Sequence, residues 1–238
     1  MRKNLSERLD STALKAVLFD MDGVLFDSMR NHATAWEQTM KLHGLSMTVN
    51  DAYMNEGRTG EGTINIFSQR YWGRDATKQE IQDIYKAKSD IFKTLPEARP
   101  VEGAADVLDN VRKRGLMRII VTGSGQVSLL SRLEESFPGH FMEDTLVTAF
   151  DVRHGKPDPE PYLIGLEKAG RAIGLSTPLA ASQAIVVENA PLGIQAAKAA
   201  GIYCIAVNTG PLEDSILYDA GADIVLPGMS ELAGVLAG

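Results

Sequence analysis

Six short runs of mostly aliphatic residues recur along the chain, and they constrain its fold more than any other feature. They are residues 16–19, 117–121, 145–149, 184–187, 202–207 and 223–226. Several are almost continuously apolar rather than alternating, which is typical of parallel strands that helices cover on both faces. Segments with helical periodicity separate the runs, and one of them, residues 104–111, is predicted to end at Gly115. The sequence therefore predicts an α/β fold with a doubly wound, Rossmann-like parallel sheet as its core.

One long interval interrupts this alternation, because it contains no run typical of a buried strand. Its first helical pattern is expected to end at Gly44, and its last begins with a Thr77 cap and is apolar on one face except at Lys88. An insertion after the first strand hangs over the carboxyl edge of the sheet, where such folds bind ligands, and is placed to act as a lid. We therefore predict two domains, an α/β core of residues 1–31 and 98–238 and an inserted helical cap of residues 32–97.

Composition excludes several classes of protein. Hydrophobic residues make up 44% of the 238 residues and charged residues 23%, as in globular proteins rather than disordered or fibrous ones. The net charge of −7 offers no basic footprint for nucleic acid or an anionic membrane. Cys204 is the single cysteine, and no apolar segment has the length of a signal or a membrane span. We expect a cytoplasmic protein without nucleic-acid or membrane partners; a monomer is expected, although the sequence carries no signal for it.

The most informative segment is Asp-Met-Asp-Gly-Val-Leu-Phe-Asp-Ser at residues 20–28, directly after the first predicted strand. Asp20 and Asp22 therefore stand where a parallel strand ends, and side chains there leave the hydrogen-bonded ladder and can share a cation. Gly23 permits a sharp reversal of the chain. An Asp-Gly turn with solvated carboxylates is the alternative for Asp22 and Gly23 alone, but the complete nine-residue string disfavours it.

This string closely resembles the pattern Asp-x-Asp-Gly-Val-Leu-x-Asp-Ser of the haloacid dehalogenase superfamily. Within that family, most of the chain is similar to the group with a helical cap that includes β-phosphoglucomutase. The resemblance implies that Asp20 is the nucleophile and Asp22 the general acid/base of a phosphoryl transfer through an aspartyl phosphate. Dehalogenating members lack the second aspartate, so Asp22 favours phosphoryl transfer over cleavage of a carbon–halogen bond.

Three further matches follow in the order that the family has them, each at or just beyond a predicted strand end. Thr122 matches the residue that hydrogen-bonds the phosphoryl group, and the adjoining Gly123 and Ser124 offer backbone donors to a substrate. Lys156 lies in a proline-rich loop, from which a lysine can hold the nucleophile and the phosphoryl oxygens as a point charge. Taken alone, Thr122 would be read as a helix cap in a turn and Lys156 as a solvated surface lysine.

The last match concerns a metal site. Glu188 and Asn189 follow the fourth predicted strand, where family members usually place two acids that complete a magnesium site. With Asp20 and the backbone carbonyl of Asp22, they suffice in type and number for Mg²⁺. The amide of Asn189 removes one negative charge, which should weaken the site. Asp151 is a further candidate ligand.

The predicted cap matches β-phosphoglucomutase only in part. His32 and Trp36 correspond to a His and a Trp near the cap hinge, where the His helps to align the acid/base aspartate, so both are candidates for substrate binding. Glu56 and Gly60, in contrast, stand where the mutase has a lysine and an arginine that hold the sugar phosphate, and Arg58 is the candidate replacement. The alternatives are a partly exposed helix residue for His32, simple cap packing for Trp36 and a solvated loop arginine for Arg58.

The resemblance implies Mg²⁺-dependent phosphoryl transfer, and we expect hydrolysis of a small phosphorylated sugar. The alternative is mutase-type interconversion of β-glucose 1-phosphate and glucose 6-phosphate, in which a sugar hydroxyl instead of water attacks the aspartyl phosphate. A third hypothesis, motivated by Asn189, is a catalytically weak phosphosugar-binding regulator. Lys156 does not belong to a nucleotide P-loop, because Pro157 follows it and the upstream glycine is missing, and the sequence has no serine nucleophile elbow.

Overall fold

The computed structural model describes residues 2–125 and 129–237, and in these residues six strands form one parallel sheet. The strand order is β3-β2-β1-β4-β5-β6. The chain thus moves outward from β1 to β3 and returns to place β4 on the other side of β1, which creates a topological switch point between β1 and β4. The strands are β1 (Ala16–Phe19), β2 (Met117–Val121), β3 (Leu146–Val147), β4 (Ala184–Glu188), β5 (Tyr203–Val207) and β6 (Ile224–Leu226).

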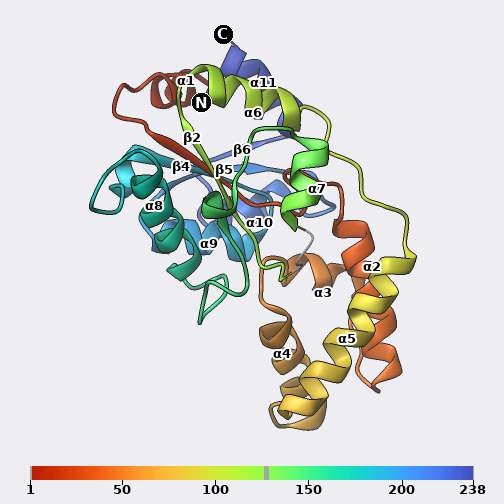
Figure 1. Cartoon of the computed structure of the whole chain (residues 1–238). Coiled ribbons are helices and arrows are strands. Elements are labelled where there is room, and N and C mark those ends of the chain that lie inside the picture. The colour runs from red at the N-terminus through yellow and green to blue at the C-terminus, as the bar shows by residue number, and fades with distance from the viewer. Residues whose placement is uncertain (1, 126–128, 238) are drawn as a thin grey trace.

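Helices cover both faces of the sheet, as the continuously apolar strands predict (Figure 1). Successive residues of β1 point to opposite sides, so that Val17 and Phe19 join one core cluster while Ala16 and Leu18 join the other. The first cluster lies under α1 (Arg2–Leu9), α6 (Ala104–Lys113), α7 (Leu129–Ser136) and α11 (Met229–Ala237). The second lies under α8 (Glu160–Ala172), α9 (Pro191–Ala199) and α10 (Asp214–Asp219). The predicted α/β fold is confirmed.

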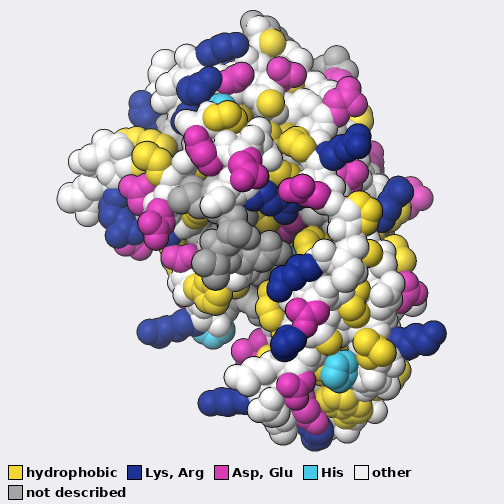
Figure 2. Space-filling model, turned by 45° about the vertical axis from the view of Figure 1, so that its right-hand side comes forward, with side chains coloured by type: hydrophobic (Ala, Val, Ile, Leu, Met, Phe, Trp, Pro, Cys, Tyr) yellow, Lys and Arg dark blue, Asp and Glu magenta, His cyan; other side chains and the backbone are white. Residues whose placement is uncertain are grey.

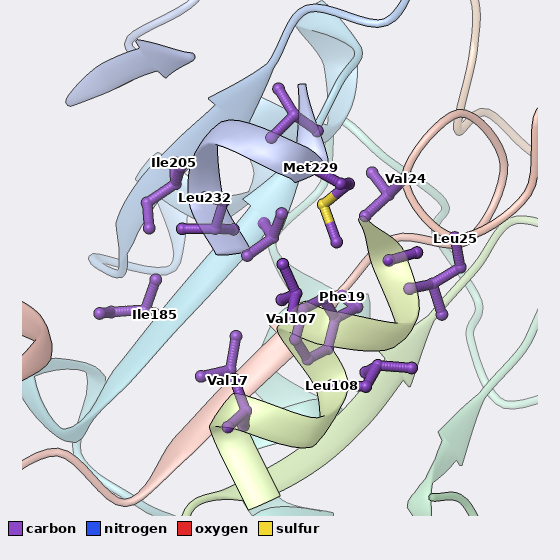
Figure 3. Packing of buried hydrophobic residues seen from close by; sticks show 14 of the residues in the cluster. Val17, Phe19, Val24, Leu25, Val107, Leu108, Ile185, Ile205, Met229 and Leu232 are labelled. Atoms are coloured by element: carbon purple, nitrogen blue, oxygen red, sulfur yellow. The ribbon is translucent and has the colours of Figure 1, made fainter. Parts of the chain in front are cut away.

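Packing of the first cluster fixes the core, and Figure 3 shows how closely its side chains interdigitate. Helix α6 turns Val107 and Leu108 onto Val17 and Phe19 of β1, and all four side chains are at most 2% exposed. Truncating such a leucine to alanine typically costs about 2–5 kcal/mol of stability. This rigid core holds the end of β1 in place, where the informative aspartates follow.

The helical insert has a core of its own. It consists of α2 (Met29–Leu42), α3 (Val49–Met54), α4 (Gly60–Trp72) and α5 (Lys78–Thr94), and it lies beyond the sheet, at the end of the molecule opposite to both termini (Figure 1). Two predicted signals are confirmed: Gly44 adopts φ +70° after α2, and Thr77 caps α5 together with Glu80. Helix α2 already begins at Met29, so the predicted boundary at residue 32 falls within its first turn.

Two short chain segments connect the insert to the core and pair with each other. The Val101 amide donates to the Leu25 carbonyl, and the Asp27 amide donates to the Arg99 carbonyl, both at 2.9 Å. This two-stranded hinge fixes where the insert leaves and returns. Acidic and basic side chains are interspersed over the face that Figure 2 shows. None of the described helices combines the length and the apolar character that crossing a membrane requires.

Candidate active site

Three polar side chains meet at the carboxyl edge of the sheet, beside the switch point. Asp20 follows β1, Thr122 follows β2 and Glu188 ends β4. All three are buried, and the backbone ladder carries them into place: the Asp20 amide donates to Val187 O at 3.0 Å and the Thr122 amide to Val147 O at 2.9 Å. The predicted convergence of these strand ends is therefore present in the structure.

Lys156 joins two of these groups. It lies in the loop before α8, is 1% exposed, and donates from Nζ to Asp20 Oδ1 at 2.5 Å, to Glu188 Oε1 at 2.7 Å and to the Val121 carbonyl at 3.0 Å. Burial opposes the charge on the ammonium, but the neighbouring Asp20 and Glu188 carboxylates raise the pKa of Lys156 above its ordinary value. The lysine therefore stays protonated beside the predicted nucleophile, which rules out the alternative of a solvated surface lysine.

The Glu188 carboxylate is saturated by donors from the protein. Its Oε1 accepts from Lys156 Nζ and from the Tyr162 hydroxyl at 2.8 Å, and its Oε2 accepts from the backbone amides of Asn189 and Ala190 at 2.9 and 3.1 Å. Tyr162 is a residue that sequence reasoning missed, although it lies in the first turn of the helix that follows the lysine loop. Glu188 thus holds Lys156 in place, and its service as a metal ligand stays a prediction.

Asp22 sits in the tight turn that Gly23 closes with φ +85°. The Asp22 Oδ1 accepts from Ser28 Oγ at 2.5 Å and lies 3.3 Å from His32 Nε2. The other ring nitrogen, Nδ1, is 2.8 Å from Nζ of Lys88 on α5. Because the lysine donates to Nδ1, the imidazole proton lies on Nε2 and points at Asp22. A chain of hydrogen bonds therefore connects Lys88, His32 and Asp22.

Electrostatics give each member of this chain a defined charge at neutral pH. Burial opposes ionisation of Asp22, but contacts with His32 and Ser28 lower the pKa of this carboxyl well below its ordinary value. Burial and the Lys88 charge lower the pKa of His32, so the imidazole is neutral. Burial also lowers the pKa of Lys88 to about 8. The chain consists of an ammonium, a neutral imidazole and a carboxylate.

Lys88 was the one interruption of the apolar face of its helix, and sequence reasoning gave it no role. The structure buries it at 6% exposure. Its Nζ lies 5.5 Å from the ring centroid of Trp36 and 4.9 Å from that of Phe92, so the two rings partly solvate the charge. Trp36 therefore packs in the insert and also supports Lys88.

The insert brings a further carboxylate to the same edge. Glu56, in the loop between α3 and α4, is 7% exposed and accepts from Asn189 Nδ2 at 2.8 Å. Burial and the Asp20 charge raise the pKa of Glu56 well above its ordinary value. A side chain at Gly23 would lie 2.1 Å from Asn189 Nδ2, so only glycine leaves room for this contact. The insert and the core thus meet directly at the predicted metal site.

Oxygen donors that suit magnesium gather here. The Oδ1 of Asn189 is buried and accepts no hydrogen bond from any described residue. Within residues 2–125 and 129–237 no three His, Cys, Asp or Glu side chains form a cage for a metal ion. Mg²⁺, however, is commonly bound by one or two carboxylates while it keeps several waters. Asp20, the Asp22 carbonyl and Asn189, with Glu56 beside them, fit that pattern.

Asp151 does not join them. Its Oδ2 accepts from the amide and the hydroxyl of Thr148, and its Oδ1 accepts from Lys168 Nζ at 2.9 Å. It is also absent from the residues that line the cavity next to Asp20. These contacts hold Asp151 in its own loop after β3, and its selection as a further candidate ligand stays a prediction.

A cavity of about 70 Å³ lies between the core and the insert. Ligand pockets for drug-sized molecules usually measure about 300–1,000 Å³, so this cavity is small. The Arg58 side chain makes no hydrogen bond or ion pair with any residue in the described part of the chain, and its Nε is buried. A half-buried cation without a partner is available to an anionic ligand. The predicted substrate-binding residues all line this cavity: His32, Trp36, Arg58, Gly123 and Ser124.

Comparisons with known proteins agree with this geometry. The family model for haloacid dehalogenase-like hydrolases matches residues 14–201. Hexitol phosphatase A of Escherichia coli (strain K12) is 31% identical over 219 residues, which cover 92% of this chain and 93% of that protein. The phosphorylated carbohydrates phosphatase of Thermotoga maritima is 27% identical over 94% of this chain and 98% of its own. A Bacteroides vulgatus structure with the provisional name beta-phosphoglucomutase is 48% identical, with a TM-score of 0.88 over 99% of this chain and 95% of its own.

Proposed function

This chain belongs to the haloacid dehalogenase-like hydrolase family, and from that membership we propose that it hydrolyses small phosphorylated sugars with Mg²⁺ as its metal. The observation that carries the proposal is the contact of 2.5 Å between Lys156 Nζ and Asp20 Oδ1 at the cavity. A buried carboxylate next to a fixed ammonium is suited to attack a phosphoryl group whose charge the ammonium offsets.

In the first step, the Asp20 carboxylate attacks the phosphorus in line with the leaving oxygen. The Lys156 ammonium offsets the charge on the phosphoryl oxygens, and the Thr122 hydroxyl donates to one of them. Asp22, a carboxylate at rest, receives a proton from Lys88 through His32 and passes it to the leaving oxygen. When bound, Mg²⁺ would supply positive charge against the phosphoryl oxygens, held by Asp20, the Asp22 carbonyl and Asn189 with Glu56 nearby. In the second step, Asp22 takes a proton from the water that attacks phosphorylated Asp20.

The chain of Lys88, His32 and Asp22 supports both steps. It holds the Asp22 carboxyl toward the cavity and connects it to a proton donor with a pKa of about 8. A group that must give and then take a proton works best when its partners are positioned in advance. Because His32 and Lys88 both belong to the insert, Asp22 acquires these partners only when the insert is closed over the core.

The substrate class rests on the relatives and on the cavity. Two relatives are named as phosphatases of hexitols and of phosphorylated carbohydrates. The cavity of about 70 Å³ favours the transferring phosphoryl group with a small leaving group. The Arg58 side chain in its wall has no partner among the described residues and suits an anionic ligand. Hydrolysis of a small phosphorylated sugar is therefore the first candidate.

Mutase-type interconversion of β-glucose 1-phosphate and glucose 6-phosphate is the second candidate. The positions of His32 and Trp36 beside Asp22 and Lys88 favour it, as does the name of the Bacteroides vulgatus relative. Glu56 disfavours the mutase reaction, because by the resemblance the mutase has a lysine for the sugar phosphate at this position and this chain has a buried acid. A catalytically weak phosphosugar-binding regulator, the third hypothesis, requires that turnover be absent.

One screen separates the three. Purified protein with Mg²⁺ is given phosphate compounds graded by leaving group, from glucose 6-phosphate through glycerol 3-phosphate to pyrophosphate, and β-glucose 1-phosphate with a trace of the bisphosphate. Inorganic phosphate and isomer formation are followed in parallel. We expect phosphate release that chelation of the metal abolishes. Isomer formation would indicate the mutase, and turnover of pyrophosphate alone would refute the sugar assignment while retaining phosphoryl transfer.

Variants test the assigned residues. Asp20→Asn should abolish turnover of every compound, and Asp22→Asn should slow both formation and hydrolysis of the phosphorylated enzyme. Lys156→Ala should lose phosphate handling without unfolding. The exposed Asp219, in the last turn of α10, provides the matched control, and Asp219→Asn should leave turnover unchanged. Turnover by Asp20→Asn would refute the proposed mechanism.

A further inference from the structure

One buried polar group next to the site has no part in the proposed mechanism: the hydroxyl of Tyr162. Tyr162 is 0% exposed and packs with the second core cluster under α8. A phenylalanine ring would fill the same apolar surroundings, so packing alone does not require the hydroxyl. The hydroxyl donates to Glu188 Oε1 at 2.8 Å, and this oxygen is the one that also accepts from Lys156.

The contacts around Lys156 leave its ammonium no freedom. Its three N–H donors are used by Asp20, by Glu188 and by the Val121 carbonyl. The position of the ammonium therefore depends on where Glu188 Oε1 lies and on how much negative charge this oxygen offers. A carboxylate oxygen with two donors divides its charge between them, so the Tyr162 hydroxyl weakens the pull of Glu188 on the lysine.

The other carboxylate oxygen of Glu188 is already fixed. Its Oε2 accepts from the amides of Asn189 and Ala190, at the start of α9. Without the Tyr162 hydroxyl, Oε1 would keep a single donor, and Glu188 would draw the Lys156 ammonium toward itself. The contact between Lys156 and Asp20 would lengthen as a result.

We propose that Tyr162 is a positioning residue for phosphoryl transfer, whose hydroxyl acts through Glu188 to hold the Lys156 ammonium against Asp20. The inference rests on the proposed function, because the place of Lys156 matters for catalysis only if Asp20 is the nucleophile. Tyr162 itself does not line the cavity, so it influences the reaction without touching a substrate.

The test begins with Tyr162→Phe, which removes the hydroxyl and keeps the ring that lies 5.1 Å from Lys156 Nζ. We expect kcat to fall about ten- to a hundredfold, the range for loss of a buried hydrogen bond to a charged group. KM should stay within about twofold, because uniform substrate binding is not removed. Tyr203→Phe, which removes a hydroxyl from the half-buried tyrosine on β5, should leave kcat unchanged.

A double-mutant cycle separates positioning from a general structural role. Single-turnover phosphorylation of Asp20 is measured for Tyr162→Phe, Glu188→Gln and the double variant. If Tyr162 acts through Glu188, the double variant should be no more than about twofold slower than Glu188→Gln alone. Independent contributions would instead multiply, and that result would overturn the proposal.

The remaining outcomes are equally decisive. A Tyr162→Phe enzyme with wild-type kcat would refute the positioning role, and one that loses its fold in thermal unfolding would assign the hydroxyl to stability instead. If Asp20→Asn keeps turnover, the proposed function fails first. If Asp20→Asn is inactive while Tyr162→Phe is fully active, only the role of Tyr162 fails.

Discussion

Replacement of Gly193 by alanine should damage the site more than any other change of one methyl group. Gly193 lies in the first turn of α9, and a Cβ there would be 1.7 Å from Oε1 and 2.0 Å from Cδ of Glu188. Glu188 is 0% exposed and its carboxylate is held by four donors, so it cannot swing aside without losing partners. The methyl group and the carboxylate cannot both keep their places.

The expected loss of stability follows from three contributions. Alanine gains about 1 kcal/mol over glycine in a helix. Displacing Glu188 sacrifices at least one hydrogen bond to a charged group, about 1.5–3 kcal/mol. Overpacking a filled core costs about 1–3 kcal/mol. The free energy of unfolding should therefore fall by about 3 kcal/mol, and turnover by about a hundredfold or more, because Lys156 loses the partner that holds it.

Urea unfolding and phosphate release, measured on the same preparation, check both expectations. The matched control is Gly234→Ala in α11, an exposed helical glycine with nothing within 4 Å of an added Cβ. It should gain up to about 1 kcal/mol of stability and keep full turnover. A Gly193→Ala variant as stable and as active as Gly234→Ala would show that the carboxylate of Glu188 does not lie where the argument requires it.

Three further predictions concern pH, metal and closure. Turnover should fall as pH rises through about 8. Burial lowers the pKa of Lys88 to about 8, so above this pH the lysine is neutral and no longer supplies a proton to His32. Lys88→Arg should move the fall to higher pH in a pH–rate profile, and a flat profile would contradict the prediction. Magnesium binding, measured by calorimetry, should tighten as pH rises, because burial and the Glu188 charge raise the pKa of Asp20 and the cation competes with a proton for this carboxylate. Affinity independent of pH would argue against Asp20 as a ligand. Gly123→Ala should lower kcat/KM, because the added Cβ would lie 2.8 Å from the Gly57 carbonyl of the insert and hinder closure. The free energy of unfolding in urea should change by less than about 1 kcal/mol. Unchanged kinetics would contradict the prediction.

The strands whose apolar runs are buried on both faces could be predicted from the sequence. The length of a strand could not be predicted where a local hydrogen bond ends it. Residues 145–149 were predicted as a strand, yet β3 contains only Leu146–Val147. Thr145 belongs to a 3-10 turn instead, because its hydroxyl donates to the Met142 carbonyl at 2.8 Å and accepts from the Met142 amide at 2.9 Å. Caps such as Gly44 and Thr77 were predictable, because their signals lie within a few residues of the helix that they end or begin.

Some residues of the candidate site could likewise be predicted from the sequence and others could not. Asp20, Thr122 and Glu188 were predictable, because each follows a run that reads as a strand and parallel strands end at one edge. Lys88 and Tyr162 were not, because their partners lie 56 and 26 residues away in the sequence and only the packed structure brings them together. The visible signal for Lys88 was a charge on an otherwise apolar helical face, which a protein rarely buries without a partner.

The contact between Asn189 and Glu56 changes the interpretation of the amide at position 189. By the resemblance, the mutase has a lysine at the position of Glu56, and family members usually have an acid at that of Asn189, so both positions carry altered charge in this chain. Two carboxylates 2.8 Å apart would repel by about 6 kcal/mol at an effective dielectric constant of 20, whereas the amide donates to Glu56 at 2.8 Å. The amide at 189 therefore suits an acid at 56, because it donates to this acid and adds no negative charge beside it. Glu56 of the insert supplies a carboxyl group beside position 189, where the core has the amide of Asn189. The amide alone is therefore no reason to regard the chain as a binding protein without catalysis.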